Sequence, residues 1–230
     1  MNILLVSATE VEIQIVLENL EQVDIWSDRL KKYRYKQMNL DVLVTGIGMI
    51  NTAFHLGKTL SFSYDFALNV GIAGSFDKAI DLGTVLHIVQ DEFTELGAED
   101  HDNFISLIEL GLQKENSFPY TGKVLINTSV IDSPVLNKLP KVSGITVNTV
   151  HGNAISIKNV IDKFSPTTES MEGAAFLLAC LTEKIPCAQI RAISNYVEPR
   201  NKEAWNIPLA VKNLNDKIAE ILNELSETHE

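Results

Sequence analysis

Short apolar runs alternate along this chain with longer amphipathic patterns. Runs of apolar residues bounded by turn residues predict strands at 3–6, 40–45, 66–70, 85–89, 123–126, 145–149 and 188–193. Apolar residues at helical spacing predict helices at 50–60, 130–138, 171–183 and 207–225. Because strands and helices interleave, we predict an α/β protein with a mixed or mainly parallel sheet. The acidic stretch 94–119 predicts long loops over one edge.

Composition narrows the class of protein further. With 230 residues and 45% apolar content, the chain can bury a large core, and we predict a single domain over 1–230. A formal charge of −11 makes nucleic acid or an anionic membrane an unfavourable partner. Cys180 and Cys187 are the two cysteines, and they stand in apolar surroundings. This pattern, with no signal peptide at the start and no run of membrane-spanning length, predicts a cytoplasmic protein.

A small-molecule pocket is predicted where a helix and a strand meet. Glu172 stands at the head of the apolar helix 171–183, and Ser194 and Asn195 follow the apolar strand 188–193. Polar residues at strand ends and helix starts are where α/β proteins build such pockets. A capping role alone, in which Glu172 complements the positive helix end and Ser170 or Thr168 binds its free amides, is the competing interpretation.

Two glycine turns exclude some cofactors. Gly46-Ile47-Gly48 opens a helix after a strand, but the third glycine of a dinucleotide motif and its acidic partner are missing, so a nicotinamide or flavin is not expected. The residues Ile72, Ala73 and Gly74 follow another strand, where small residues let backbone amides face a substrate. The chain has no phosphate loop of the Gly-Lys-Ser/Thr type. We therefore expect no cofactor.

The histidines do not indicate a metal or a nucleophile. His101 lies between two aspartates, but adjacent residues point apart, so a solvated acidic loop is the better interpretation. His151, which follows the predicted strand 145–149, is either a pocket residue or a hydrogen-bonded structural histidine. Serine, histidine and aspartate, or cysteine and histidine, do not stand at a recognisable catalytic spacing. No metal site is expected.

Several separated segments together resemble one superfamily, that of the nucleoside phosphorylases and nucleosidases. They are residues 7–12, 45–48, 69–74, 170–173 and 191–195. Within the superfamily, segments 169–176 and 193–201, with Trp205 beyond, are most similar to the futalosine hydrolases of menaquinone biosynthesis. The resemblance implies a three-layer α/β fold, with a central mixed sheet partly closed into a barrel and flanked by helices. It also implies a homodimer or larger assembly that acts on a nucleoside.

The resemblance also implies roles for individual residues. Glu12 matches the glutamate that activates water, Glu172 the one that binds ribose hydroxyls, and Met171 the methionine under the sugar. Asn195 stands where nucleosidases that release adenine carry an aspartate. An amide can donate to N7 or O6 of a 6-oxopurine, which favours hypoxanthine as the leaving base. Ile72 replaces a serine of those nucleosidases.

Further substrate contacts are expected from Ala73, Gly74, Thr149 and Ser194 at the strand ends. For the benzoate of futalosine, the candidate anchor is Arg200, whose guanidinium could form two charge-assisted hydrogen bonds. The alternative is a solvated surface arginine.

The residues also indicate which reaction is favoured. Breaking an N-glycosidic bond develops positive charge on the sugar, which carboxylates stabilise, and Glu12 could act as general base toward water. Phosphorolysis needs cations, and the first arginine in the chain is Arg29, so hydrolysis is predicted. Two alternatives stay open: a related nucleosidase for a 5′-substituted adenosine, such as aminodeoxyfutalosine, methylthioadenosine or adenosylhomocysteine, and a non-catalytic purine-nucleoside binding module.

Overall fold

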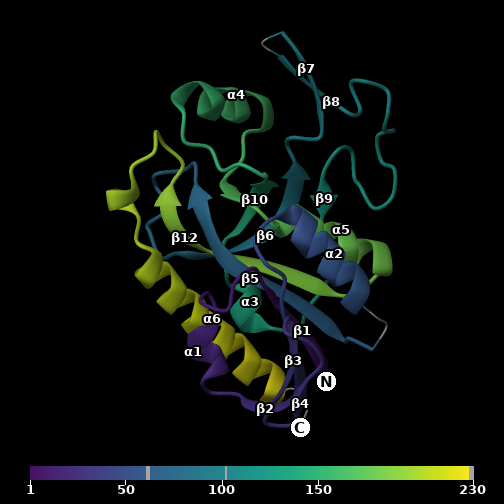
Figure 1. Ribbon diagram of the computed structural model, residues 1–230, viewed down its shortest axis with the longest axis vertical. Helices are drawn as coiled ribbons and strands as arrows, with labels where there is room; N and C mark the ends of the chain where they lie inside the picture. The colour runs from purple at the N-terminus through teal and green to yellow at the C-terminus, as the bar shows by residue number, and fades with distance from the viewer. Residues whose placement is uncertain (61–62, 102, 228–230) are drawn as a thin grey trace.

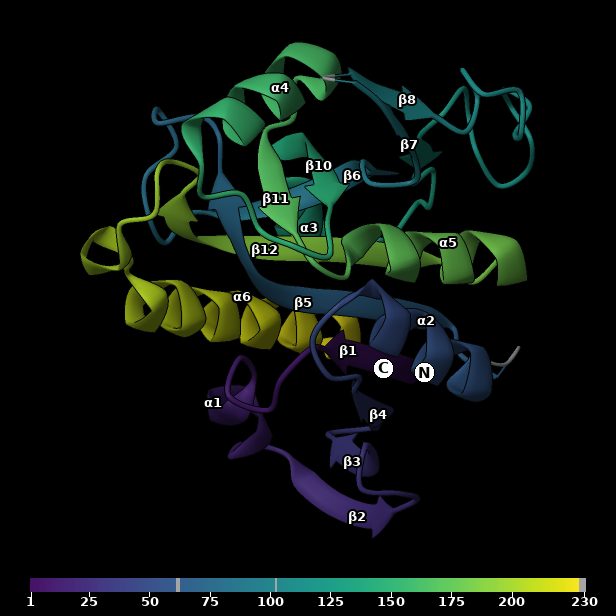
Figure 2. The same cartoon turned by 45° about the horizontal axis from the view of Figure 1, so that its top comes forward.

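The computed structural model describes residues 1–60, 63–101 and 103–227, and its centre is a strongly bent sheet (Figures 1 and 2). Ten strands of this part of the chain join the sheet: β1 (Asn2–Ser7), β2 (Glu21–Ile25), β3 (Leu30–Tyr35), β4 (Met38–Val44), β5 (Phe66–Ser75), β6 (Val85–Phe93), β9 (Leu125–Ile126), β10 (Lys141–Thr146), β11 (Thr168–Ser170) and β12 (Cys187–Tyr196). Strands β7 (Gly97–Asp100) and β8 (Asn103–Ser106) form a separate hairpin.

The long strand β5 closes part of the sheet into a barrel. Its first half pairs in parallel with β1, and most of its length pairs in parallel with β12. Near its end it also pairs, antiparallel, with β11. Since β11 continues through β10 and β6 back to β12, these strands form a closed ring. Strands β4, β3 and β2 extend the sheet beyond β1. The predicted mixed sheet, partly closed into a barrel, is confirmed.

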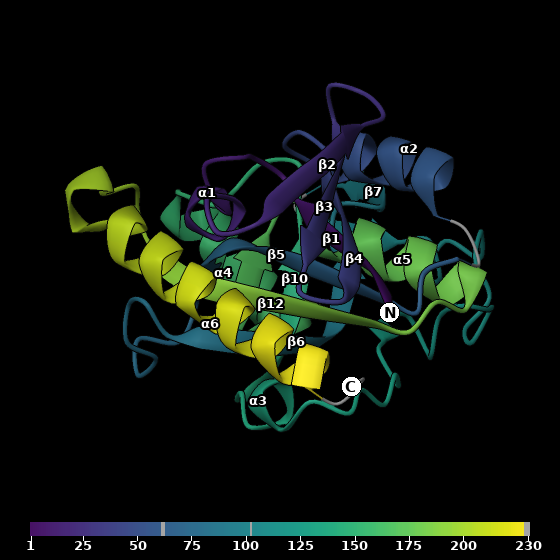
Figure 3. The ribbon, with the colours of Figure 1, turned by 90° about the horizontal axis from the view of Figure 1, so that it is seen from below.

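Helices cover the sheet on both faces, as Figure 3 shows from below. On one face lie α2 (Met49–Thr59) and α5 (Gly173–Glu183), which pack against each other. On the other face lie α1 (Gln14–Leu17), α3 (Pro134–Asn137) and the long α6 (Ile207–Glu227). The helix α4 (Ala154–Phe164) lies near the β7–β8 hairpin (Figure 2). No helix of the described residues is both long and apolar enough to cross a membrane.

The start of α5 differs from the prediction. The helix begins at Gly173, so Glu172 is its N-cap residue and lies outside its first turn. Its free amides bind other side chains: the N–H of Ala174 donates to Thr146 Oγ1 at 2.7 Å, and that of Gly173 to Ser170 Oγ at 3.4 Å. The Glu172 carboxylate is therefore left available for other contacts. At α6, Asn206 caps the helix, because its Oδ1 accepts from the N–H of Leu209.

Three other predicted elements need correction. The helix predicted at 130–138 shrinks to α3, because Ser133 caps a helix that Pro134 starts, and Pro140 follows closely. The strand predicted at 145–149 is β10, which ends at Thr146 because its partner β11 ends at Ser170. The stretch 94–119 is not only loops, since it carries the β7–β8 hairpin. The sequence patterns also missed β2, β3, β11, α1 and α4.

Candidate active site

The end of β5 passes beneath the candidate catalytic residues. At Gly71 a side chain would collide with the site, since an added Cβ would lie 3.0 Å from Glu12 Oε1 and 3.7 Å from Arg191 Cζ. At Gly74 an added Cβ would lie 3.1 Å from Asn195 Nδ2. These glycines therefore leave room for charged and amide groups next to the strand. Because a strand rises about 3.3 Å per residue, the two positions are roughly 10 Å apart, which is about the length of a nucleoside.

Glu12 lies in the loop after β1 and is held tightly. Its Oε2 accepts from the N–H and the hydroxyl of Thr9, at 3.0 and 2.9 Å, and from the hydroxyl of Ser7 at 3.2 Å. Its Oε1 accepts from the backbone N–H of Ile72 at 3.1 Å. Oε1 keeps a lone pair on the side of Gly71, where a water molecule could be activated. At Ile72 it is therefore the backbone N–H that contacts Glu12.

The main chain of Glu12 is anchored separately by the last helix. Asn215 of α6 is 1% exposed, and its Nδ2 donates to the Glu12 carbonyl at 2.8 Å. Its Oδ1 accepts from the N–H of Val16 at 3.0 Å. One buried amide thus fixes both ends of the turn that carries Glu12.

Glu172 faces the site from the start of α5. Its side chain is buried, and its Oε1 accepts from the backbone N–H of Gly48 at 2.9 Å. Gly48, at a φ of 96°, belongs to the glycine turn after β4. Burial raises the pKa of Glu172, and the nearby Glu12 adds to this, while Arg191 and the Gly48 N–H oppose it. The N–H of Gly48 in the glycine turn therefore holds the Glu172 carboxylate.

The buried Arg191 is a charged residue of the candidate site that the sequence patterns did not single out. It lies within β12, is 1% exposed, and donates to Asn69 Oδ1 at 2.5 Å and to the Ile190 carbonyl at 3.0 Å. Burial lowers the pKa of Arg191, whereas the charges of Glu172 and Glu12 raise it. Residues 72–74, predicted to follow a strand, lie within β5. Cations lie near both glycine segments, because an added Cβ at Gly46 would lie 3.0 Å from Arg29 Nη1 and one at Gly71 would lie 3.7 Å from Arg191 Cζ. The expectation of a site without nearby cations is thus wrong.

Asn195 and Ser194 stand at a bulge near the end of β12, opposite Gly74. Ser194 is buried, and its hydroxyl lies 2.8 Å from Asn195 Oδ1 and 3.3 Å from the Ala73 carbonyl. Asn195 Nδ2 donates to the Tyr196 carbonyl at 3.1 Å. With Oδ1 engaged by Ser194, the group that Asn195 can offer a ligand is its second amide proton. Met171 is half-buried next to Glu172, and Ala73 is buried in β5.

The other two predicted contacts lie outside this group. Thr149 is exposed, and its N–H approaches Glu95 Oε1 at 3.4 Å. Arg200 is exposed, and its guanidinium lies 5.4 Å from the centre of the Trp205 ring. The N–H of Arg200 donates to the Gly152 carbonyl at 3.1 Å, so the loop after β12 touches the loop after β10.

His151 forms a largely buried hydrogen-bonded pair with Glu169. Its Nδ1 bonds to Glu169 Oε2, and its backbone N–H donates to Glu169 Oε1 at 2.9 Å. The side chains of His151 and Glu169 are only 16% and 3% exposed. Glu169 raises the pKa of His151, chiefly through the hydrogen bond. His151 is thus hydrogen-bonded, as one of its two interpretations predicted. Its Nε2 atom has no hydrogen-bond partner within the described ranges.

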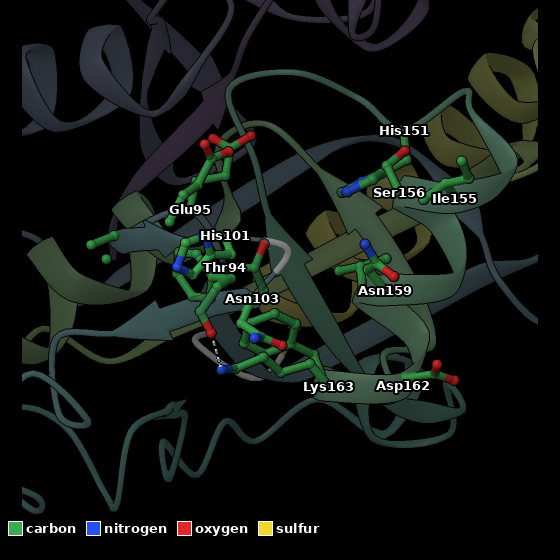
Figure 4. Close-up of a pocket in the computed structure, with 16 residues that line it drawn as sticks. Thr94, Glu95, His101, Asn103, His151, Ile155, Ser156, Asn159, Asp162 and Lys163 are labelled. Carbon is green, nitrogen blue, oxygen red and sulfur yellow. Dashed lines mark hydrogen bonds between the residues drawn. The ribbon is translucent and has the colours of Figure 1, made fainter.

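His151 also borders an open cavity of about 890 Å³ between the β7–β8 hairpin and α4. Figure 4 shows His151, Ile155 and Ser156 along one side and Glu95, Thr94 and His101 along the other. His101 is exposed, with its Nε2 3.8 Å from Asp100 Oδ1. Within the part of the chain that the structure describes, no three His, Cys, Asp or Glu side chains are grouped to hold a metal ion.

The fold and the position of these residues define a class of protein. The chain has the fold of the nucleosidases in the nucleoside phosphorylase superfamily. It superposes on the futalosine hydrolase of Helicobacter pylori with a TM-score of 0.78, at 17% identity and over 97% of this chain and 98% of that one. A 5′-methylthioadenosine/S-adenosylhomocysteine nucleosidase from Colwellia psychrerythraea, in complex with adenine, gives 0.77 at 18% identity, over 98% and 96%.

Curated proteins with similar sequences include futalosine hydrolases. The chain is 26% identical to the futalosine hydrolase of Streptomyces coelicolor over 196 residues, which cover 79% of this chain and 77% of that one. It is 28% identical to the futalosine hydrolase of Acidothermus cellulolyticus over 192 residues, or 78% and 73%. No family model matches the chain. The chain is thus a homologue of the futalosine hydrolases, and the resemblance predicted from its motifs is confirmed.

Proposed function

We propose that this protein hydrolyses the N-glycosidic bond of futalosine and releases hypoxanthine in menaquinone biosynthesis. The observation that carries the proposal is the order of groups along β5. A fixed carboxylate, Glu12, lies at Gly71 next to Glu172 and Arg191, and the amide of Asn195 lies at Gly74. Groups in this order could contact, one after the other, the attacking water, the ribose and the purine base of a nucleoside.

The two carboxylates would have different roles. Glu12 Oε1 would take a proton from the attacking water, while Oε2 stays fixed by Thr9 and Ser7. Glu172, held by the Gly48 N–H, would bind the ribose hydroxyls. Both negative charges would stabilise the positive charge that develops on the sugar as the bond to the base breaks. A module that only bound nucleosides would not need the fixed Glu12 carboxylate.

Water is a better nucleophile than phosphate for this site, although cations are near. Arg191 is buried and already bonded to Asn69 and the Ile190 carbonyl, and it lies in the field of Glu12 and Glu172. Arg29 donates to the Val44 carbonyl at 3.2 Å. A phosphate anion would have to approach two carboxylates, which repel it. The positions of the charges thus support hydrolysis.

We propose that the protein forms a homodimer with a second copy of the chain. The side chains of Ile47, Ile50 and Phe54 are 58%, 76% and 60% exposed, and they follow one another at helical spacing along α2 and its leading turn. This apolar face begins next to Gly48, which holds Glu172, so a homodimer contact there would lie beside the site. The single domain over 1–230 and the cytoplasmic location stay predictions from the sequence.

The proposal is tested by incubating purified protein with futalosine in phosphate buffer and in phosphate-free buffer. Hypoxanthine and a sugar with a free 1-hydroxyl are expected in both buffers, at similar rates. Formation of a sugar 1-phosphate would show phosphorolysis, and absence of hypoxanthine would refute the proposed substrate.

A related nucleosidase for 5′-substituted adenosines is the second candidate. It is favoured by a 25% identity over 232 residues to the 5′-methylthioadenosine/S-adenosylhomocysteine nucleosidase of Staphylococcus carnosus, covering 96% of this chain and 99% of that one. Methylthioadenosine and aminodeoxyfutalosine in the same assay separate the candidates, because this activity would release adenine.

A further inference from the structure

The His151–Glu169 pair is a buried charge pair to which the proposed chemistry gives no role. Burying a histidine and a carboxylate together is unfavourable unless both are well bonded, and here Glu169 uses both its oxygens on one residue. This double contact fixes the backbone and the ring of His151 at once. It leaves Nε2 as the ring atom that can meet a ligand.

The register of the barrel places this pair at the end of the site where the base would lie. Glu169 of β11 stands directly opposite Gly74 of β5, and Asn195 of β12 stands opposite the same glycine on the other side. Directly opposite residues in a sheet point to the same face. An added Cβ at Gly74 would approach Asn195 Nδ2 at 3.1 Å, so that face carries the Asn195 amide. Glu169 and Asn195 therefore flank one gap above Gly74.

The loop contacts support the same placement. His151 precedes Gly152, whose carbonyl accepts from the Arg200 N–H, and Arg200 lies five residues after Asn195. The loop that carries His151 is thus held to β11 by Glu169 and to the loop after β12 by Arg200. Neighbouring strands are about 4.8 Å apart, so the gap between β11 and β12 across β5 is roughly 10 Å, enough for a purine ring with its hydrogen bonds.

We propose that His151, positioned by Glu169, selects a 6-oxopurine base by donating a hydrogen bond from Nε2 to its O6 atom. The inference rests on the proposed nucleosidase function. With Nδ1 bonded to the Glu169 carboxylate, Nε2 is a donor when the ring is protonated, and the negative charge of Glu169 favours that form. The remaining amide proton of Asn195 is a second donor from the opposite side. Two donors suit a carbonyl oxygen, whereas a 6-amino group would place N–H against N–H.

The charges around the imidazole are mixed. Glu169 faces it from β11 and Glu95 from the segment after β6, while His101 and Lys163 line the same cavity. Both glutamates raise the pKa of His151 and so favour the protonated ring, in which Nε2 is a donor.

The test compares the wild type with His151→Phe, which keeps the ring volume and removes the donor, and with Glu169→Gln, which removes the charge of the partner. Futalosine and its 6-amino counterpart aminodeoxyfutalosine are the paired substrates. The ratio of their kcat/KM values should fall about tenfold or more in His151→Phe, mainly through loss on futalosine. In Glu169→Gln, the loss of futalosine activity at alkaline pH should begin at a lower pH than in the wild type.

A second experiment does not need turnover: calorimetry measures the binding of free hypoxanthine and free adenine. His151→Phe should weaken hypoxanthine binding about tenfold and leave adenine binding within about threefold. Equal losses for both bases, or an unchanged ratio in a variant with wild-type thermal stability, would overturn the inference even if futalosine is hydrolysed. Failure of the wild type to release hypoxanthine would instead count against the proposed function, while the binding arm still tests His151.

Discussion

Asn215 donates a hydrogen bond to the carbonyl of Glu12 at 2.8 Å, which joins two residues that lie 203 positions apart in the chain. The same amide binds Val16 and Val211, so α6 holds the loop of the proposed general base. Thr9, Ser7 and Ile72 fix the side chain of Glu12. Asn215 fixes the main chain of Glu12. Catalysis by Glu12 should therefore depend on a residue that does not touch the substrate.

Asn215→Ala should lower both stability and activity. The N–H of Val16 and the carbonyl of Glu12 would lose a buried partner, which costs about 1–3 kcal/mol in unfolding free energy. Misplacement of Glu12 should lower kcat about tenfold with less effect on KM. Asn213→Ala is the matched control, because Asn213 donates to the Gly83 carbonyl at 2.9 Å from the same helix. Equal kcat values in the two variants would contradict the positioning role.

Glu12→Gln should abolish most turnover. The amide keeps the shape of the side chain but cannot accept a proton from water, so kcat should fall about a hundredfold or more. Substrate binding should weaken little. Glu10→Gln is the control, since exposed Glu10 pairs with Lys31 at 3.1 Å, outside the site. Near-normal turnover by Glu12→Gln would remove Glu12 from the role of general base.

Asn195→Asp should change the preference between bases. The aspartate would present an acceptor where the amide presents a donor, and when protonated it could serve an adenine leaving group. Activity on futalosine should decrease, and activity on aminodeoxyfutalosine should decrease less or increase. The ratio of the two kcat/KM values is the measurement, and an unchanged ratio would show that Asn195 does not select the base.

Arg200→Ala tests the anchor for the benzoate of futalosine. Arg200 is exposed and lies over Trp205, so its guanidinium is free to bind a carboxylate at the edge of the site. If it does, kcat/KM for futalosine should fall about tenfold, and that for inosine, which lacks the carboxylate, should stay nearly constant. Equal loss on both substrates, or no loss on either, would identify Arg200 as a surface residue.

The buried carboxyl group of Asp91 should make the free energy of unfolding depend on pH. It is fully buried beneath the start of α5, where its Oδ1 accepts from Thr146 and its Oδ2 from Gln189. Burial raises the pKa of Asp91 from 3.8 to about 6. Between these values the folded protein holds the proton more tightly than the unfolded chain, so this contribution is complete below about pH 4 and is lost as pH rises through about 6.

Urea unfolding of wild type and Asp91→Asn at several pH values measures this contribution. From about pH 4 to about pH 7, the wild type should lose on the order of 3 kcal/mol relative to the variant. A difference between the two proteins that does not vary with pH would mean that Asp91 titrates normally.

Much of the fold follows from patterns that are local in sequence. Strands such as β1, β5 and β12 are apolar on both faces, so their runs are visible without any partner. The segment β11 is three residues long, Thr168-Glu169-Ser170, and carries no apolar signal. Its strand form depends on pairing with β10 and β5, which no local pattern reveals.

The residues of the candidate site also differ in whether a local sequence pattern predicts them. Glu12, Glu172 and Asn195 stand next to strand or helix ends, where polar residues attract attention. Arg191 lies inside an apolar strand, and only the convergence of Glu12, Glu172 and Asp91 around it explains why a charge is buried there. Asn215 interrupts the apolar face of a helix as an ordinary polar residue would, and its partners are far away in the sequence.

The docking of α6 has a consequence for how the protein becomes active during synthesis. All residues proposed to touch the substrate lie before residue 207, where α6 begins. Yet α6 supplies Asn215 to the loop of Glu12 and packs against β5 and β12, so a nascent chain that lacks it holds the catalytic groups without their framework. Activity should thus arise abruptly after the last helix leaves the ribosome, and ribosome-bound chains ending near residue 206 should be inactive.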